Sequence, residues 1–351
     1  MTDIFDYGYM PTSEISDIDK DEVARISAVH KERYEIVCKY GTASARLKSS
    51  VYYSGKEYEP FPTTGDFVRI IYSDCGDSQI IKTLPRQSFF SRRDPSPGRG
   101  EQAVSANFDY VFILSSLNHD LNIKRLQRYL TLSWQSGAVP VVILNKADLV
   151  DDYSEQLRMV EKVAVGVGVH AVSAKSGYGL DMLSEYLKPR KTIVFLGSSG
   201  VGKSSLLNAL CGEEAMKVND IREDDSKGRH TTTHRQLNML PNGVMIIDTP
   251  GMRELGMWDV SEGLGEAFGD VEDYLGKCRF NDCTHGNEPG CAIKEAIENG
   301  ALPAERWESY LQLKKEAKFT DDKAGYMKDK QQWQKDIAKW CKQNKKNGRK
   351  V

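Results

Sequence analysis

Two short motifs occur in an order that restricts the folds open to this chain. The apolar run and loop VVILNKADLV occupies residues 141–150, and the glycine-rich loop GSSGVGKS follows only at residues 197–204. Each loop comes directly after an apolar stretch that is typical of a buried strand. In most domains that carry both motifs the glycine-rich loop comes first. Both loops can therefore serve one site only if the chain passes through the domain in a shifted order.

The glycine-rich loop has the strand–loop–helix context of a phosphate-binding loop. It matches G-x-x-x-x-G-K-[ST], follows the apolar run TIVFL and precedes SSLLNAL. Its backbone N–H groups can close around phosphate oxygens at a helix N-terminus. Lys203 can reach the β- and γ-phosphates, and the hydroxyl of Ser204 can bind Mg²⁺. The predicted nucleotide-binding residues of this loop are Gly197, Ser198, Ser199, Gly200, Val201, Gly202, Lys203, Ser204 and Ser205.

The run GVMIIDTPG supplies a second motif on the phosphate side. It places Asp248 at the end of an apolar strand on the metal side of the phosphates, and Gly251 can offer its N–H to a γ-phosphate. Between the two motifs lies SKGRHTTTHR at residues 226–235. One threonine of residues 231–233 can complete the Mg²⁺ shell. The sequence does not distinguish the three, and Thr232 is the central candidate.

The loop NKAD predicts recognition of guanine. The carboxylate of Asp148 can accept hydrogen bonds from the ring N–H and the amino group of guanine, a pattern that adenine lacks. Asn145 can bond the purine edge and hold neighbouring loops, and the aliphatic stem of Lys146 can cover the base. A second loop, SAK, follows the strand run VHAV, and the N–H of Ala174 can meet guanine O6. The predicted base-binding residues are Asn145, Lys146, Ala147, Asp148, Ser173, Ala174 and Lys175.

Residues 108–268 alternate apolar strand runs with helical periodicity, which predicts an α/β doubly wound parallel sheet of the P-loop GTPase kind. The motif order within it is a cyclic shift of the usual order. A doubly wound domain tolerates such a shift because its termini often lie close together. The ligand crevice at the carboxyl ends of the strands stays the same. The sequence therefore predicts a circularly permuted GTPase domain.

Residues 23–85 predict a small β-barrel, because five short strand patterns are separated by turn signals and no helical pattern intervenes. An OB-fold and an SH3-like barrel both fit this pattern. Residues 1–22 form an acidic N-terminal extension to which the sequence assigns no role. Residues 86–107 are rich in Pro, Gly, Ser and Arg, and this composition predicts a loop or linker.

The segment CRFNDCTHGNEPGC brings four soft metal ligands together with the spacing C-x4-C-x-H-x5-C. Three thiolates and one imidazole fill a tetrahedral zinc shell with no open position, so the predicted Zn²⁺, one per chain, is structural. The alternative is three unrelated reduced cysteines and a surface histidine. Residues 269–351 are predicted to be a mostly helical zinc-binding domain with a basic helical tail. The predicted zinc ligands are Cys278, Cys283, His285 and Cys291.

The composition is that of an ordinary soluble chain, with 28% charged and 40% hydrophobic residues. No apolar run approaches the roughly 18–20 residues that a membrane span needs, and no secretory signal pattern begins the chain. A cytoplasmic location without a membrane partner is therefore expected. Residues 314–351 contain 13 Lys or Arg and 5 Asp or Glu. This basic tail suits an anionic partner such as RNA, or forms a solvated helix face.

The permuted motif order, GSSGVGKSS, GRHTTT, DTPG and the cysteine cluster together resemble the ribosome small-subunit-dependent GTPase A family (RsgA, also called YjeQ). The resemblance covers roughly residues 23–320. It implies an OB-fold, a permuted GTPase domain and a zinc-binding domain. It also implies a cytoplasmic GTPase that converts GTP to GDP, binds the small (30S) ribosomal subunit and its rRNA, and acts late in subunit maturation. A monomer is expected. The acidic extension falls outside the family pattern.

Met252 follows DTPG where many GTPases place a water-orienting glutamine. A thioether positions water poorly, so slow intrinsic hydrolysis is expected. The family resemblance suggests His230, in GRHTTT, as the catalytic replacement when the ribosome orders its loop. The alternative is that His230 only contacts RNA or phosphate.

Two other functions compete with a ribosome-activated GTPase. One is a nucleotide-gated RNA-binding module in which hydrolysis is incidental, and stimulation of turnover by small subunits separates it from the first. The other is an ATPase, which the guanine-reading loop NKAD argues against.

Overall fold

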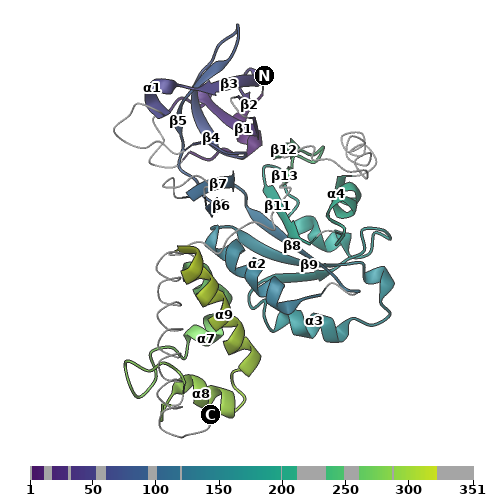
Figure 1. Ribbon diagram of the computed structural model, residues 1–351. Coiled ribbons are helices and arrows are strands. Elements are labelled where there is room, and N and C mark those ends of the chain that lie inside the picture. The colour runs from purple at the N-terminus through teal and green to yellow at the C-terminus, as the bar shows by residue number, and fades with distance from the viewer. Residues whose placement is uncertain are drawn as a thin grey trace, which may run out of the picture. The chain divides into compact units, whose positions relative to one another are not determined.

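The structure is a computed structural model, and it describes residues 2–11, 18–30, 33–52, 61–93, 101–118, 121–198, 200–211, 235–248, 261–286 and 288–321. The chain divides into two compact units, residues 1–255 and residues 256–351. The first unit contains the barrel and the α/β domain. The second contains the cysteine cluster and the helices around it (Figure 1).

The N-terminal strands fold as the predicted barrel. They run in the order β1-β2-β3-β5-β4, and β1 also pairs with β4, which closes the barrel. Strands β3 and β5 are parallel and the other neighbours are antiparallel, as in a Greek-key OB-fold. Inward-facing side chains such as Ile26, Ile36 and Ile80 form its core. The elements are β1 (Val23–Val29), β2 (Tyr34–Cys38), β3 (Gly41–Leu47), α1 (Ser49–Tyr52), β4 (Phe67–Ile71) and β5 (Ser78–Thr83).

The α/β domain holds the parallel sheet that the apolar runs predict, with strand order β10-β9-β8-β11-β13. Side chains on both faces of the central strands are buried, since helices cover them. Helix α2 packs on β8 and β9. Residues 180–185 form the 3-10 helix η4. The elements are β8 (Tyr110–Ser116), α2 (Ile123–Gln135), β9 (Val139–Asn145), η3 (Ala147–Leu149), α3 (Ser154–Glu161), β10 (Gly168–Ala171), η4 (Leu180–Glu185), β11 (Thr192–Gly197), α4 (Lys203–Cys211), β12 (Gln236–Met239) and β13 (Met245–Asp248).

A sheet continuous between barrel and α/β domain is a feature that the sequence did not predict. Strand β12 pairs antiparallel with β13 and, on its other side, with β1 through the register Ala28↔Gln236. The barrel and the α/β sheet therefore belong to one 11-stranded sheet (Figure 1).

The stretch predicted as a loop or linker, residues 86–107, contains an antiparallel ribbon instead. Its strands are β6 (Phe89–Arg93) and β7 (Glu101–Ala106), paired from Phe89↔Ala106 to Arg93↔Glu101. The Pro and Gly residues that suggested a loop all lie in the connection DPSPGRG between these strands. The ring of Phe90 stacks on Phe108 at 4.8 Å between centroids, which holds the ribbon against the α/β domain.

The acidic N-terminal extension packs against the barrel. It contains two 3-10 helices, η1 (Ile4–Tyr7) and η2 (Lys20–Glu22). Ile4 and Tyr9 are 3% exposed and share a hydrophobic cluster with Phe67 and Leu84. Apolar side chains between the acidic residues thus form a second hydrophobic cluster with barrel residues, separate from the barrel core.

The second unit contains four helices among its described residues, α6 (Ser261–Ala267), α7 (Gly269–Glu272), α8 (Ala292–Glu298) and α9 (Ala304–Asp321). Helices α6 and α7 pack on α9. Arg306 of α9 is 5% exposed and binds both carboxylate oxygens of Asp270, and its guanidinium lies 4.1 Å from the ring centroid of Phe268. Residues 314–321 of the predicted basic tail belong to α9, and the part of the tail after residue 321 lies outside the described residues. Within the described parts of the chain, no helix has the length and apolarity to cross a membrane.

Candidate functional site

The parallel strands bring the predicted motifs to one edge of the sheet. The carboxyl ends of β9, β10, β11 and β13 carry NKAD, SAK, the glycine-rich loop and Asp248, in that order. Strand β8 lies between β9 and β11, so the base-reading loops and the phosphate loop flank it. A crevice of this kind, outside the carboxyl ends of parallel strands, is where doubly wound domains bind ligands.

The phosphate loop has backbone conformations and contacts that require its glycines. Gly202 has φ +95, and a Cβ there would lie 2.3 Å from Nδ2 of Asn145. Gly200, with φ +81, also lies in the left-handed region. The ammonium of Lys203 donates to the carbonyls of Gly197 and Ser198 at 2.7 and 2.6 Å. The lysine therefore lies within the loop that is predicted to surround the phosphates.

Asn145 joins the base-reading loops to the phosphate loop. Its side chain is 2% exposed, Nδ2 donates to the carbonyl of Val201 at 2.9 Å, and Oδ1 accepts from the N–H of Ala174 at 3.2 Å. One amide thus connects three loops. The same bond occupies the Ala174 N–H that the sequence assigned to guanine O6.

The carboxylate of Asp148 is exposed and held in place by Ser173. The hydroxyl of Ser173, which is fully buried, donates to Oδ1 of Asp148 at 2.6 Å and accepts from the N–H of Ser176 at 3.1 Å. Nζ of Lys146 donates to the carbonyl of Gly200 at 2.8 Å, which ties this loop to the phosphate loop a second time. A residue from the second predicted base loop thus orients the Asp148 carboxylate and leaves its Oδ2 outside this hydrogen bond.

The remaining predicted residues fall into three groups. Ser204 and Ser205 are exposed at the start of α4, Lys175 is exposed, and Ala147 is buried with its N–H on the carbonyl of Val172. The backbone of Asp248 ends β13, but its side chain is not among those described. Four predicted residues lie outside the described residues, namely Ser199, His230, Thr232 and Gly251.

A contact between the rims of the two base loops was not foreseen from the sequence. The hydroxyls of Tyr153 and Tyr178 lie 2.9 Å apart. Tyr178 also accepts the N–H of Ser173 at its carbonyl, at 2.9 Å. The only sequence signal is the position of Tyr178 three residues after SAK, which is too weak to predict the contact.

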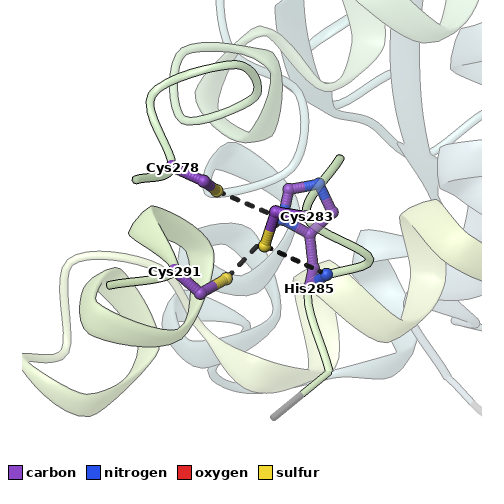
Figure 2. A group of neighbouring side chains, drawn as sticks. All are labelled: Cys278, Cys283, His285 and Cys291. Atoms are coloured by element: carbon purple, nitrogen blue, oxygen red, sulfur yellow. Dashed lines mark hydrogen bonds between the residues drawn. The ribbon is translucent and has the colours of Figure 1, made fainter. Parts of the chain in front are cut away.

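The second unit brings the four predicted zinc ligands together. Their donor atoms all lie within 4.8 Å of one another, and Figure 2 shows the side chains converging on one centre. Nδ1 of His285 lies 3.4 Å from Sγ of Cys278 and 3.6 Å from Sγ of Cys291. Zinc bonds of ordinary length place sulfur and nitrogen ligands about 3.5 Å apart in a tetrahedron. The donor set and its spacing therefore fit a zinc ion.

The packing around the cluster indicates a structural role. Cys291 is the residue before helix α8, and the N–H of Ala292 donates to Sγ of Cys278 at 3.4 Å. The ring of His285 meets that of Trp307 of α9 edge to face, with centroids 5.4 Å apart. A metal at this centre would hold the loop to the start of α8 without an open coordination position, and the loop packs on α9 through His285.

The parallel sheet, the phosphate loop and the base-reading loops joined by Asn145, in a shifted order along the chain, define a circularly permuted P-loop GTPase. A family model described as RsgA GTPase matches residues 83–258. The chain belongs to this family, as the sequence resemblance predicted. A second model, described as ABC transporter, matches residues 180–351, a span that includes the phosphate loop but neither base-reading loop.

Curated relatives support the same assignment. The chain is 47% identical over 292 residues to "Small ribosomal subunit biogenesis GTPase RsgA 1" of Listeria monocytogenes, covering 83% of this chain and 82% of that protein. It is 44% identical over 301 residues to "Small ribosomal subunit biogenesis GTPase RsgA" of Methanosarcina acetivorans, covering 86% of this chain and 80% of that protein.

Solved structures agree with the fold. YjeQ from Thermotoga maritima has a TM-score of 0.62 and 26% identity, and the match covers 83% of this chain and 96% of that one. YloQ, described as a circularly permuted GTPase, has a TM-score of 0.58 over 86% of this chain and 96% of that one. Its identity of 23% supports the fold alone.

Proposed function

We propose that this protein is a GTPase that acts in the late assembly of the small (30S) ribosomal subunit, in the cytoplasm and as a monomer. The geometry that carries the GTPase assignment is the bridge from Asn145 to Val201 and Ala174, which joins base and phosphate loops into one site. The ribosomal assignment rests on family membership, since the curated relatives are described as small ribosomal subunit biogenesis GTPases. Binding to rRNA is part of the same proposal.

Recognition of GTP is divided between the two sets of loops. We assign the guanine edge to Asp148, oriented by Ser173, and the phosphates to Lys203 and the backbone of the phosphate loop. A Mg²⁺ ion, when bound, neutralises charge on the phosphates and lowers the barrier to their transfer. Ser204, Asp248 and a threonine, with Thr232 as the central candidate, are the residues that would hold it.

Hydrolysis requires a water held in line with the γ-phosphate. Met252 cannot hold it, because a thioether is a weak acceptor. We assign that task to His230, acting once the small subunit has ordered its loop. A Zn²⁺ ion would stabilise the second unit and take no part in the reaction. Its ligands would be Cys278, Cys283, His285 and Cys291.

Phosphate release from GTP, with and without purified small subunits, tests this function. The expected result is slow turnover by the protein alone. Small subunits that supply the missing positioning should raise the rate of hydrolysis, by up to about 10³–10⁵-fold. ATP in place of GTP is the control for base recognition. Absence of stimulation by small subunits, with GTP still bound, would favour the nucleotide-gated RNA-binding module.

A further inference from the structure

The barrel contacts strands β12 and β13, which border the two loops predicted to lie near the γ-phosphate, residues 226–235 and the loop after Asp248. Strand β12 begins at Gln236, directly after the stretch 226–235 that contains His230, and β13 ends at Asp248. Strand β12 pairs with β13 on one side and with barrel strand β1 on the other (Figure 1). The barrel and the ends of these strands are therefore parts of one hydrogen-bonded sheet.

Thr64 fixes the residue at the entrance of β12. Its side chain is 1% exposed, and its hydroxyl donates to the carbonyl of Arg235 at 3.2 Å. Its own carbonyl accepts the N–H of Ala106, the last residue of β7, at 3.0 Å. Thr64 thus connects the β6–β7 ribbon to the residue that precedes β12.

Gly65 brings the barrel into close contact with β13 as well. It has φ +92, and a Cβ there would lie 2.1 Å from the carbonyl oxygen of Ala106 and 2.9 Å from Cδ1 of Ile247. Ile247 is fully buried and is followed by Asp248. Only glycine allows this approach, because the backbone at this position is left-handed and the neighbouring atoms leave no space for a Cβ.

Arg25 of β1 contacts the opposite end of β13 and the start of the neighbouring strand β11. It is 1% exposed, and Nη1 donates to Oγ1 of Thr192 at 3.0 Å and lies 3.1 Å from the sulfur of Met245, at the starts of β11 and β13. Its Nε donates to the carbonyl of Gly65 at 3.2 Å. Burial lowers the pKa of Arg25 to about 10, so the side chain is still charged at neutral pH. The barrel therefore contacts β13 at both ends.

We propose that Thr64 is a positioning residue for GTP hydrolysis, through which the barrel sets where the chain enters β12. A partner that holds the barrel would then change the rate of hydrolysis. GTP affinity would change little, because the base-reading loops follow β9 and β10. In the strand order these two strands lie at the end of the sheet, with β8, β11 and β13 between them and β12. This inference rests on the proposed function, in which a partner stimulates hydrolysis.

The neighbouring threonine provides a matched control. The hydroxyl of Thr63 donates to the carbonyl of Val104 in β7 at 3.1 Å, and its side chain is 7% exposed. Thr64→Val and Thr63→Val each replace one buried hydroxyl with a methyl group, and both are expected to lower stability to a similar degree. Only Thr64→Val removes a bond to the residue before β12.

The first measurement is the rate of GTP hydrolysis with small subunits. Thr64→Val is expected to lower the stimulated kcat about three- to tenfold, the effect of one hydrogen bond, with GTP affinity within about twofold of the unmodified protein. Thr63→Val is expected to keep the stimulated rate. Thr64→Ser retains the hydroxyl and is expected to restore it, which separates positioning from a loss of folding.

The second measurement needs no ribosomal subunit. Hydrogen exchange of the β1 amides is compared between protein bound to GDP and protein bound to a non-hydrolysable GTP analogue. The unmodified protein and Thr63→Val are expected to show a nucleotide-dependent difference that Thr64→Val loses. If Thr64→Val behaves as Thr63→Val in both measurements, the inference is wrong. If subunits stimulate no variant but the exchange difference depends on Thr64, the proposed function fails and the positioning role stands.

Discussion

Replacing Asn145 with alanine removes the buried side chain that connects both base loops to the phosphate loop. Two hydrogen bonds disappear, one to Val201 at 2.9 Å and one from Ala174 at 3.2 Å. A buried hydrogen bond contributes about 0.5–1.5 kcal/mol net, so the arranged loops lose about 1–3 kcal/mol relative to other arrangements. Because GTP must then restore the arrangement when it binds, its affinity should fall about 5- to 150-fold.

Equilibrium titration and dissociation kinetics with a fluorescent GTP analogue measure this effect. Asn242→Ala is the control, since Asn242 is exposed, accepts one N–H from Val244 and lies in the turn between β12 and β13, away from the nucleotide edge. Urea unfolding of both variants shows that the protein remains folded under the assay conditions. A folded Asn145→Ala protein whose GTP affinity matches that of Asn242→Ala would refute the argument that this bridge pre-arranges the site.

Three further predictions concern separate parts of the protein. Asp148→Asn should weaken GTP binding and relax discrimination against xanthosine nucleotides, as nucleotide competition measures, and an unchanged GTP affinity would count against guanine recognition by this residue. Elemental analysis should find one zinc per chain, and Cys283→Ala should make the region after residue 256 sensitive to protease; a zinc-free native protein would contradict this. His230→Ala should lose most of the subunit-stimulated rate while GTP affinity and subunit binding persist, and full stimulation would exclude His230 as the residue that positions water.

The sequence predicted the parts of this fold that depend on local pattern. The apolar runs that became β8, β9 and β11 are buried on both faces, and their periodicity is visible without a partner. The cluster of four residues that could hold a metal was predicted for the same reason, since these residues lie close together in the chain. The hydrogen bond from Asn145 to the phosphate loop was foreseen only as a tendency to hold loops, because its partner Val201 is distant in sequence.

Elements that depend on distant partners were missed. Strand β12 has only four residues, QLNM, with no run of apolar side chains, and it exists because β13 and β1 supply hydrogen bonds on both sides. The β6–β7 ribbon was masked by the Pro and Gly residues of its connection. Ile4 and Tyr9 were obscured by the acidic residues around them, and only the apolar surface beside Phe67 shows why they are buried.

The pairing of β1 with β12 has a consequence for how the protein can be divided. Without the barrel, β12 would be the last strand of the α/β sheet and would present unpaired N–H and C=O groups to solvent. Such a bare strand is a template for association with other chains. The barrel therefore caps the edge of the α/β sheet. A fragment cut at the barrel boundary would expose β12 as an edge strand prone to aggregation, which the intact chain keeps paired.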